Sequence, residues 1–156
     1  MLAALVSLVL TLLLLLGGTP AASASSATSE SCAPISRTEV ESLFDRWNAA
    51  LASGDPAQVS ALYSPDALLL PTLSPQPRTD PAGIRDYFTT FLAGGPQGRI
   101  ESRTIQLGCN EAFDAGTYSF RFRDGHQVQA RYTFVYGFDH GQWLIVHHHS
   151  SLEPAD

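Results

Sequence analysis

Beyond residue 35, the first half of the chain repeats apolar residues at helical spacing. Five of them recur every three or four positions, which predicts an amphipathic helix: Val40, Leu43, Phe44, Trp47 and Leu51. Thr38 and Glu41 form a capping-box pattern at its start, and the polar tripeptide at 53–55 ends it. The folded domain is therefore expected to begin with a helix.

Two Asp-Pro pairs mark further helices. Asp55-Pro56 and Asp80-Pro81 each place an N-cap residue before a proline, which suits the first helical position. We expect a short helix from 56 to about 63, and a third helix from 81 that Gly94-Gly95 closes. The apolar run at 67–71 between them predicts a short strand.

From Gly98 onward apolar and polar residues alternate, which is the period of half-buried strands. Strands are expected at about 99–107, 111–123, 127–138 and 142–150, with two-residue turns at Asp124-Gly125 and His140-Gly141 joining the last three. Helices followed by consecutive antiparallel strands predict the α+β class.

The two turns predict which side chains share a face of the sheet. They pair Arg121 with Val128 and Phe134 with His147. One face would then carry Ser119, Arg121, Ala130, Tyr132, Phe134, Ile145, His147 and His149. The other would carry Tyr118, Phe120, Phe122, Arg131, Thr133, Val135, Leu144, Val146 and His148.

Arg121 makes the first of these faces the candidate site. An arginine in mid-strand between two phenylalanines is costly to bury without a partner. Beside histidines in an apolar cup, it would suit a small carboxylate or another small anion. The expected ligand-binding residues are Arg121, Tyr132, His147, His149, Trp47 and Tyr63. Alternatively, Arg121 forms a salt bridge with a helix carboxylate such as Asp45 or Asp86, and the histidines are hydrogen-bonded strand residues.

The three adjacent histidines do not predict a metal site. His148 is expected to point away from His147 and His149, and no third ligand stands at a matching position. We expect no metal and no cofactor. All nine basic residues are arginines without a cluster, and the net charge is −6, which argues against a nucleic-acid partner.

The N-terminal region has the features of an export signal. Residues 1–18 carry no charged side chain, and Ala22-Ser23-Ala24 follows as a cleavage pattern. We expect a signal peptide over 1–24, a flexible linker over 25–35, one domain over 36–154, and a secreted or periplasmic protein. An uncleaved anchor is the alternative. Cys32 and Cys109 are expected to form a disulfide, with two free thiols as the alternative.

Three segments resemble one protein family. They are "ALASGDPAQVSALYSPDALLL" after the first helix, "YSFRF" at 118–122, and "DHGQWLIVHHHSS" near the end. With the order of elements, they are similar to the nuclear transport factor 2-like cone, and in particular to the association (hub) domain of calcium/calmodulin-dependent protein kinase II and its free-standing bacterial, SnoaL-like relatives. The resemblance covers roughly residues 40–154.

This resemblance implies a cone-shaped curved sheet and a pocket. Arg121 corresponds to a hub pocket arginine, and His147 and His149 to two hub histidines, whereas Phe134 and Ser150 replace two further pocket arginines. Kinase activity is excluded, because the chain has no lysine, no Gly-rich loop and no "DFG".

The resemblance, together with the open apolar sheet face, predicts an oligomer, a homodimer or higher. The expected interface is the face that carries Tyr118, Phe120, Val135, Leu144 and Val146. We expect no carboxylate base on the central strands outside their turns. We therefore favour an exported small-ligand-binding or scaffolding domain. The alternative is a His-based isomerase, dehydratase or polyketide-cyclase-like enzyme that uses the same pocket.

Overall fold

The computed structural model describes residues 31–154. The predicted signal peptide and residues 25–30 of the predicted linker lie outside the described residues. Residues 31–36 have no regular secondary structure, and three helices and five strands follow them.

Helix α1 (Arg37–Ser53) begins at a different cap from the expected one. The hydroxyl of Ser36 accepts the backbone N–H of Glu39, and the Glu39 carboxylate accepts the N–H of Ser36 at 2.7 Å. The capping box predicted at Thr38 is therefore wrong. The preceding residue, Ile35, packs against the core, and this contact starts the helix two residues earlier.

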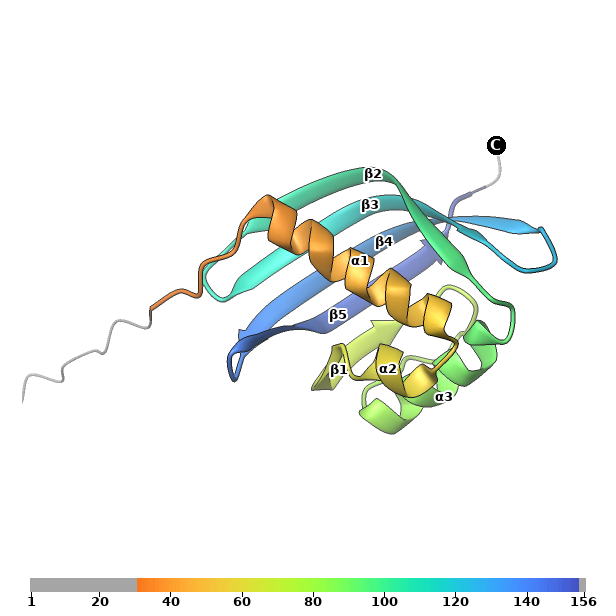
Figure 1. The fold of residues 1–156 in the computed structure, drawn as a ribbon, viewed down its shortest axis with the longest axis horizontal. Helices are drawn as coiled ribbons and strands as arrows, with labels where there is room; N and C mark the ends of the chain where they lie inside the picture. The colour runs from red at the N-terminus through yellow and green to blue at the C-terminus, as the bar shows by residue number, and fades with distance from the viewer. Residues whose placement is uncertain (1–30, 155–156) are drawn as a thin grey trace, which may run out of the picture. The chain divides into compact units, whose positions relative to one another are not determined.

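The two shorter helices begin as predicted. Asp55 is the N-cap of α2 (Pro56–Ser60) and Asp80 is the N-cap of α3 (Pro81–Leu92), and in both helices the proline follows directly. Figure 1 shows α1 crossing one face of the sheet, with α2 and α3 beside its β1 edge.

The strands form one five-stranded sheet. They are β1 (Tyr63–Leu70), β2 (Gln97–Leu107), β3 (Glu111–Arg121), β4 (Gln127–Asp139) and β5 (Gln142–Leu152). Their order across the sheet is β1-β5-β4-β3-β2, with β1 parallel to β5 and the other pairs antiparallel. The predicted α+β fold, a curved open sheet packed against three helices, is confirmed (Figure 1).

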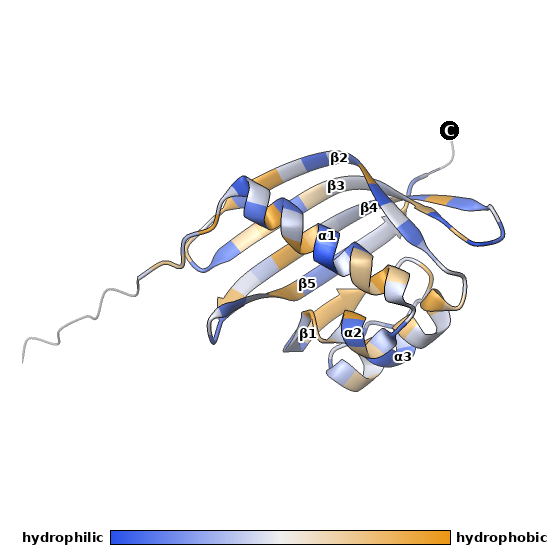
Figure 2. Ribbon diagram, viewed as in Figure 1, coloured by the Kyte–Doolittle hydropathy of each residue, from blue (hydrophilic) through white to orange (hydrophobic). Residues whose placement is uncertain are grey.

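An aromatic core fills the space between α1 and the sheet. The ring of Trp47 lies within 6.3 Å of the rings of Phe88, Phe120, Phe134 and His148, centroid to centroid. Large aromatic rings bury the most apolar area per residue, so this cluster supplies much of the driving force for folding. Polar residues gather at the tips of the β3–β4 and β4–β5 hairpins instead (Figure 2).

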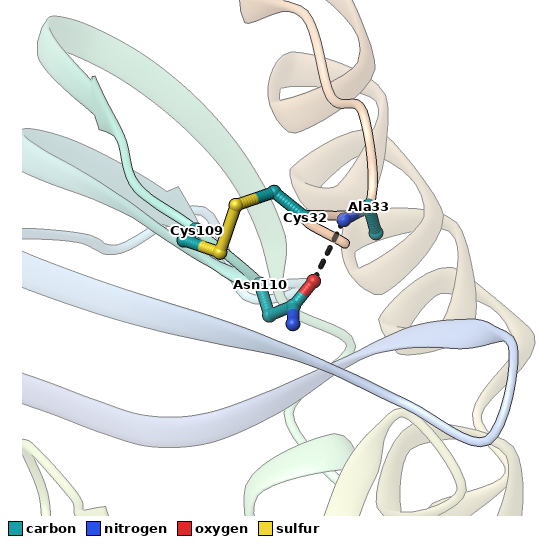
Figure 3. The surroundings of a disulfide bond; sticks show 4 residues. All are labelled: Cys32, Ala33, Cys109 and Asn110. Atoms are coloured by element: carbon teal, nitrogen blue, oxygen red, sulfur yellow. Dashed lines mark hydrogen bonds between the residues drawn. A yellow bond between two sulfur atoms is a disulfide. The ribbon is translucent and has the colours of Figure 1, made fainter. Parts of the chain in front are cut away.

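The predicted disulfide is present between Cys32 and Cys109 (Figure 3). It joins the segment before α1 to the β2–β3 turn, where the Ala33 N–H also donates to Asn110 Oδ1 at 2.7 Å. The bridge spans 77 residues of sequence, which stabilises the fold by about 4 kcal/mol on the chain-entropy view. Disulfides are typical of proteins outside the cytoplasm. Among residues 31–154, no helix has the length and apolar content needed to cross a membrane.

Candidate functional site

The β3–β4 hairpin has a longer turn than the sequence analysis assumed. Phe122 N–H donates to the carbonyl of His126, and three residues loop out between them, with Gly125 at a φ of 90°. Arg121 therefore pairs with Gln127 and not with Val128. A left-handed glycine at the third loop position is the usual geometry of such a turn, and the predicted two-residue turn is wrong.

The β4–β5 hairpin departs from the expected register through a bulge. Asp139 pairs with Gln142 as predicted, but Val146 is then an extra residue on β5, so that Phe134 lies opposite His148. Gly137 makes room for this bulge, because a Cβ there would lie 2.9 Å from Val146 Cγ1.

These two shifts exchange the predicted faces of β3 and of the end of β5. Tyr118, Phe120, His148 and Ser150 are buried on the helix-facing side of the sheet together with Tyr132. The expectation that Arg121, Tyr132, His147 and His149 line one cavity is therefore wrong. The physical reason is the period of two, because a shift of one residue turns a side chain to the opposite face.

Arg121, His147 and His149 lie on the outer side of the sheet. Arg121 and His149 are exposed and His147 is half-buried. Burial, and then the neighbouring His149, lower the pKa of His147, whereas a hydrogen bond to the backbone of Leu68 opposes this shift. Among residues 31–154, no ion pair joins Arg121 to a helix carboxylate.

Trp47, Tyr63 and His148 form the start of a directional hydrogen-bond chain. An indole N–H can only donate, so Trp47 Nε1 donates to the hydroxyl oxygen of Tyr63 at 3.0 Å. The Tyr63 hydrogen is then directed to His148 Nδ1, 2.9 Å away. Burial, and then His147 and His149, lower the pKa of His148 to about 3, so its ring is neutral at neutral pH. A neutral imidazole that accepts at Nδ1 carries its proton on Nε2.

The chain continues from His148 across the sheet. His148 Nε2 faces the hydroxyl of Tyr118 at 3.5 Å, and that hydroxyl donates to Ser150 Oγ at 2.6 Å. Ser150 Oγ in turn contacts the hydroxyl of Thr72, in the loop after β1. Burial raises the pKa of Tyr118, which keeps the phenol protonated. One hydroxyl of the Ser150–Thr72 pair donates to the other, so one hydroxyl hydrogen of this pair is not used within the chain.

A small cavity lies along this chain, with room for about one water molecule (about 10 Å³). Its walls come from α1, α3 and the inner face of the sheet: Trp47, Leu69, Pro71, Thr72, Tyr87, Phe88, Phe91, Tyr118, Phe120, His148 and Ser150. None of these lining residues, all within the described range, is an arginine, lysine or carboxylate. The cavity can therefore offer hydrogen bonds from hydroxyls to a small polar molecule against an aromatic wall.

Of the predicted site residues, Trp47 has the expected place, whereas Tyr63 and Tyr132 do not. Trp47 lines the cavity, as predicted for the wall, whereas Tyr63 lies behind His148 and holds its ring. Tyr132 is buried beside Tyr118 but is not among the residues that line the cavity.

Tyr132 instead belongs to a second polar cluster, around Asp114 on β3. It donates to Asp114 Oδ1 at 2.8 Å, Arg103 Nε donates to the same oxygen at 3.2 Å, and Arg103 Nη2 lies 2.9 Å from Asp114 Oδ2 as an ion pair. Burial raises the pKa of Asp114, and the bonds from Tyr132 and Arg103 oppose that rise. The expectation of no carboxylate on the central strands is therefore wrong, because Asp114 is completely buried in mid-strand.

The residues of the hydrogen-bond chain along the cavity that were not predicted from the sequence are Thr72, Tyr118, His148 and Ser150. A usable signal existed in Gly137, a glycine in mid-strand opposite the final strand, because such a glycine often marks a bulge. In the described part of the chain, no group of three or more His, Cys, Asp or Glu side chains is arranged to hold a metal ion.

Comparisons with known proteins agree with this fold. A structure from Xanthomonas campestris assigned to the calcium/calmodulin-dependent protein kinase II association domain is 45% identical, with a TM-score of 0.73, and the match covers 80% of this chain and 96% of that one. A cyanobacterial iota-carbonic anhydrase solved with bicarbonate is 24% identical over 78% of this chain and 94% of its own, with a TM-score of 0.67.

A dehydratase-assigned nuclear transport factor 2-like protein from Streptomyces avermitilis is 14% identical over 76% of this chain and 96% of its own, with a TM-score of 0.68. At these lower identities the likeness to the anhydrase and to the dehydratase shows the fold alone. A comparison with curated proteins found no match. The family profile described as "Calcium/calmodulin dependent protein kinase II association domain" matches residues 36–154. The chain therefore belongs to the calcium/calmodulin-dependent protein kinase II association domain family, with the nuclear transport factor 2-like fold.

Proposed function

We propose that the internal cavity binds bicarbonate and carbon dioxide, and that the protein catalyses their interconversion. The observation that carries this proposal is the hydrogen-bond chain His148–Tyr118–Ser150–Thr72 on the wall of a cavity with only about 10 Å³ of space for a water-sized molecule. The cyanobacterial relative solved with bicarbonate shares the fold and supports this choice of ligand.

The size of the cavity favours a very small substrate. Its free space of about 10 Å³ is about that of one water molecule, so the side chains of its wall must move to admit even carbon dioxide. The substrates of a ketosteroid isomerase or a polyketide cyclase would not fit the space beside Trp47 and Phe88. If the protein is an enzyme, its substrate is therefore a much smaller molecule. Aromatic walls suit uncharged carbon dioxide, and the hydroxyls of Tyr118, Ser150 and Thr72 suit the oxygens of bicarbonate.

The polarity of the chain suits the reaction. In hydration, a water oxygen bonds to the carbon of carbon dioxide, one C–O double bond becomes a single bond to an anionic oxygen, and one proton passes to solvent. Tyr118 donates to Ser150, and one hydroxyl of the Ser150–Thr72 pair donates to the other, so one hydroxyl hydrogen of this pair is left for the oxygen on which the negative charge develops. Donors held in place before the reaction stabilise such charge without reorganising. No arginine lines the cavity, so bicarbonate is held by hydrogen bonds alone and can leave.

Stopped-flow hydration of carbon dioxide, followed with a pH indicator, tests this proposal. Tyr118→Phe and Ser150→Ala each break the chain that positions the free hydroxyl hydrogen, and each should lower kcat/KM by about 100-fold, as for an oxyanion donor that is no longer held in place. Tyr132→Phe is the matched control, since it removes a neighbouring buried hydroxyl that bonds to Asp114 and not to the cavity chain. A wild-type rate no faster than buffer would reject the proposal. Equal losses in Tyr118→Phe and Tyr132→Phe would show that the effect is structural.

We further propose that the protein acts after export, cleaved near Ala24. The disulfide between Cys32 and Cys109 supports an oxidising compartment. The intact mass of the protein from the secreted or periplasmic fraction should correspond to a chain that begins near Ser25, and a mass that includes residues 1–24 would contradict cleavage.

A further inference from the structure

The internal cavity and a surface groove share a wall. The groove lies between α3 and the β3–β4 hairpin, and Tyr87 and Phe91 of α3 line both spaces. The loop after β1 also separates them, because Thr72 lines the cavity while the next residue, Leu73, lines the groove. The partition between the two spaces is therefore formed by two rings and one stretch of loop.

This partition is the part of the cavity wall that is nearest to solvent. Of the lining residues, only Thr72 and Phe91 are partly exposed, and Tyr87, at 9% relative exposure, is the most exposed of the buried ones. The opposite walls, such as Trp47 and Phe88 at 1%, are sealed by the core. A molecule that crosses from solvent to the cavity meets the least protein at Tyr87 and Phe91.

The loop is anchored at its base and less constrained at its tip. Leu69 and Arg78 exchange two backbone hydrogen bonds, of 2.8 and 2.9 Å, which hold the two ends of the loop together. Leu73, within the loop, is 52% exposed. Burial raises the pKa of Tyr87 to about 12, and a backbone hydrogen bond with Leu73 opposes that rise. The Tyr87 ring stacks on Phe91 with 5.6 Å between centroids.

We propose that small molecules enter the cavity from this groove, through the partition of Tyr87 and Phe91, and that the Tyr87 ring is the gate. Rotation of the Tyr87 ring about χ1, away from Phe91, joins the two spaces. The ring thereby limits access to molecules of very few atoms. The nature of the substrate rests on the proposed function, whereas the route rests on the shared wall.

Fluorescence quenching of Trp47 tests the route without any reaction. Trp47 lines the cavity and is one of two tryptophans in the chain, so Trp143→Phe leaves it as the only one. In that background, Tyr87→Ala should raise the acrylamide quenching constant of Trp47 severalfold. Leu92→Ala is the matched control, because Leu92 is on the same helix and similarly buried but does not line the cavity.

The outcomes separate the route from the function. Quenching in Tyr87→Ala no greater than in Leu92→Ala would overturn the gate. If Tyr87→Ala does not fold, Phe91→Ala opens the other half of the partition and should give the same increase, and no increase would reject the route. If Tyr87→Ala increases quenching while the wild-type protein does not hydrate carbon dioxide, the route stands and the proposed substrate is wrong.

Discussion

At the scale of single residues, His148 shows how burial selects a protonation state. Its ring is 3% exposed and lies against Trp47 and Phe134, with no carboxylate among its hydrogen-bond partners in the described chain. A charged imidazole would lose its hydration there without compensation. The neutral form can act as both donor and acceptor, and this is what gives the chain through Tyr118 its direction.

The lowered pKa of His148 predicts acid sensitivity of the fold. Because the pKa falls from 6.5 to about 3 on folding, the unfolded chain binds one more proton than the folded chain between these values. The free energy of unfolding should therefore decrease as the pH falls through this window, by at most about 1.4 kcal/mol per pH unit from this group. His148→Gln should flatten the dependence, as measured by urea unfolding between about pH 7 and pH 4.

The exposed neighbour His149 provides the control. His149→Gln should leave the slope close to that of the wild type, because its side chain lies on the outer face. If His148→Gln and the wild type lose stability in parallel on acidification, other groups cause the loss and the assignment of a neutral buried His148 is wrong.

At the scale of elements, the bulge on β5 decides which residues reach the cavity. It inserts Val146 between the pair Tyr136–Ile145 and the pair Val135–His147. Without the extra residue, His147 and His149 would face the helices, as the sequence analysis expected. The bulge fits because Gly137, opposite Leu144, leaves the space that a Cγ of Val146 fills.

A double-mutant cycle tests this fit. Gly137→Ala places a methyl group 2.9 Å from Val146 Cγ1, so it should destabilise the fold by about 1–3 kcal/mol, the usual cost of overpacking. In a Val146→Ala background the same substitution should cost much less, since the opposing methyl groups are gone. Urea unfolding of the four proteins gives the coupling energy. Additive effects would show that Gly137 and Val146 do not constrain each other.

At the scale of the whole molecule, the outer face of the sheet remains the proposed surface for self-association. Tyr118 and Phe120, which were expected there, face the core instead. Val135, Leu144 and Val146 are half-buried in the monomer, and Val135 stands between Phe113 and His147 in its row across the sheet. The apolar part of the surface is thus narrower than expected, and the family's association-domain description supports an interface without defining its extent.

We expect the wild-type protein to be at least a dimer and Val135→Asp to shift it to monomer. A carboxylate in the centre of this row would have to be desolvated in an interface. It would also add to the repulsion between chains that each carry a net charge of −6. Sedimentation velocity at micromolar concentration measures the assembly. Thr79→Asp adds the same charge at an exposed site before α3 and should leave the assembly intact. A wild-type protein that sediments as a monomer would contradict the prediction.

The sequence by itself determined the elements and their order. The helical spacing of Val40 to Leu51, the Asp-Pro caps and the alternation after Gly98 reflect local constraints that act within a few residues. These features place α1, α3 and the four long strands within a few residues of their observed bounds. The pairing of Cys32 with Cys109 was also predictable, because the chain offers no other cysteine.

Only the tertiary structure decided which side chains meet in the cavity. The third turn residue at Gly125 and the bulge at Val146 each change the pairing by one residue, and neither is fixed by the alternation of the strands. Because side chains alternate with a period of two, each change moves a set of residues between solvent and core. The free-energy cost of burial explains which residues lie inside. His148 can be buried as a neutral ring at little cost. Arg121 would have to lose the hydration of its charge, and it lies on the outer face.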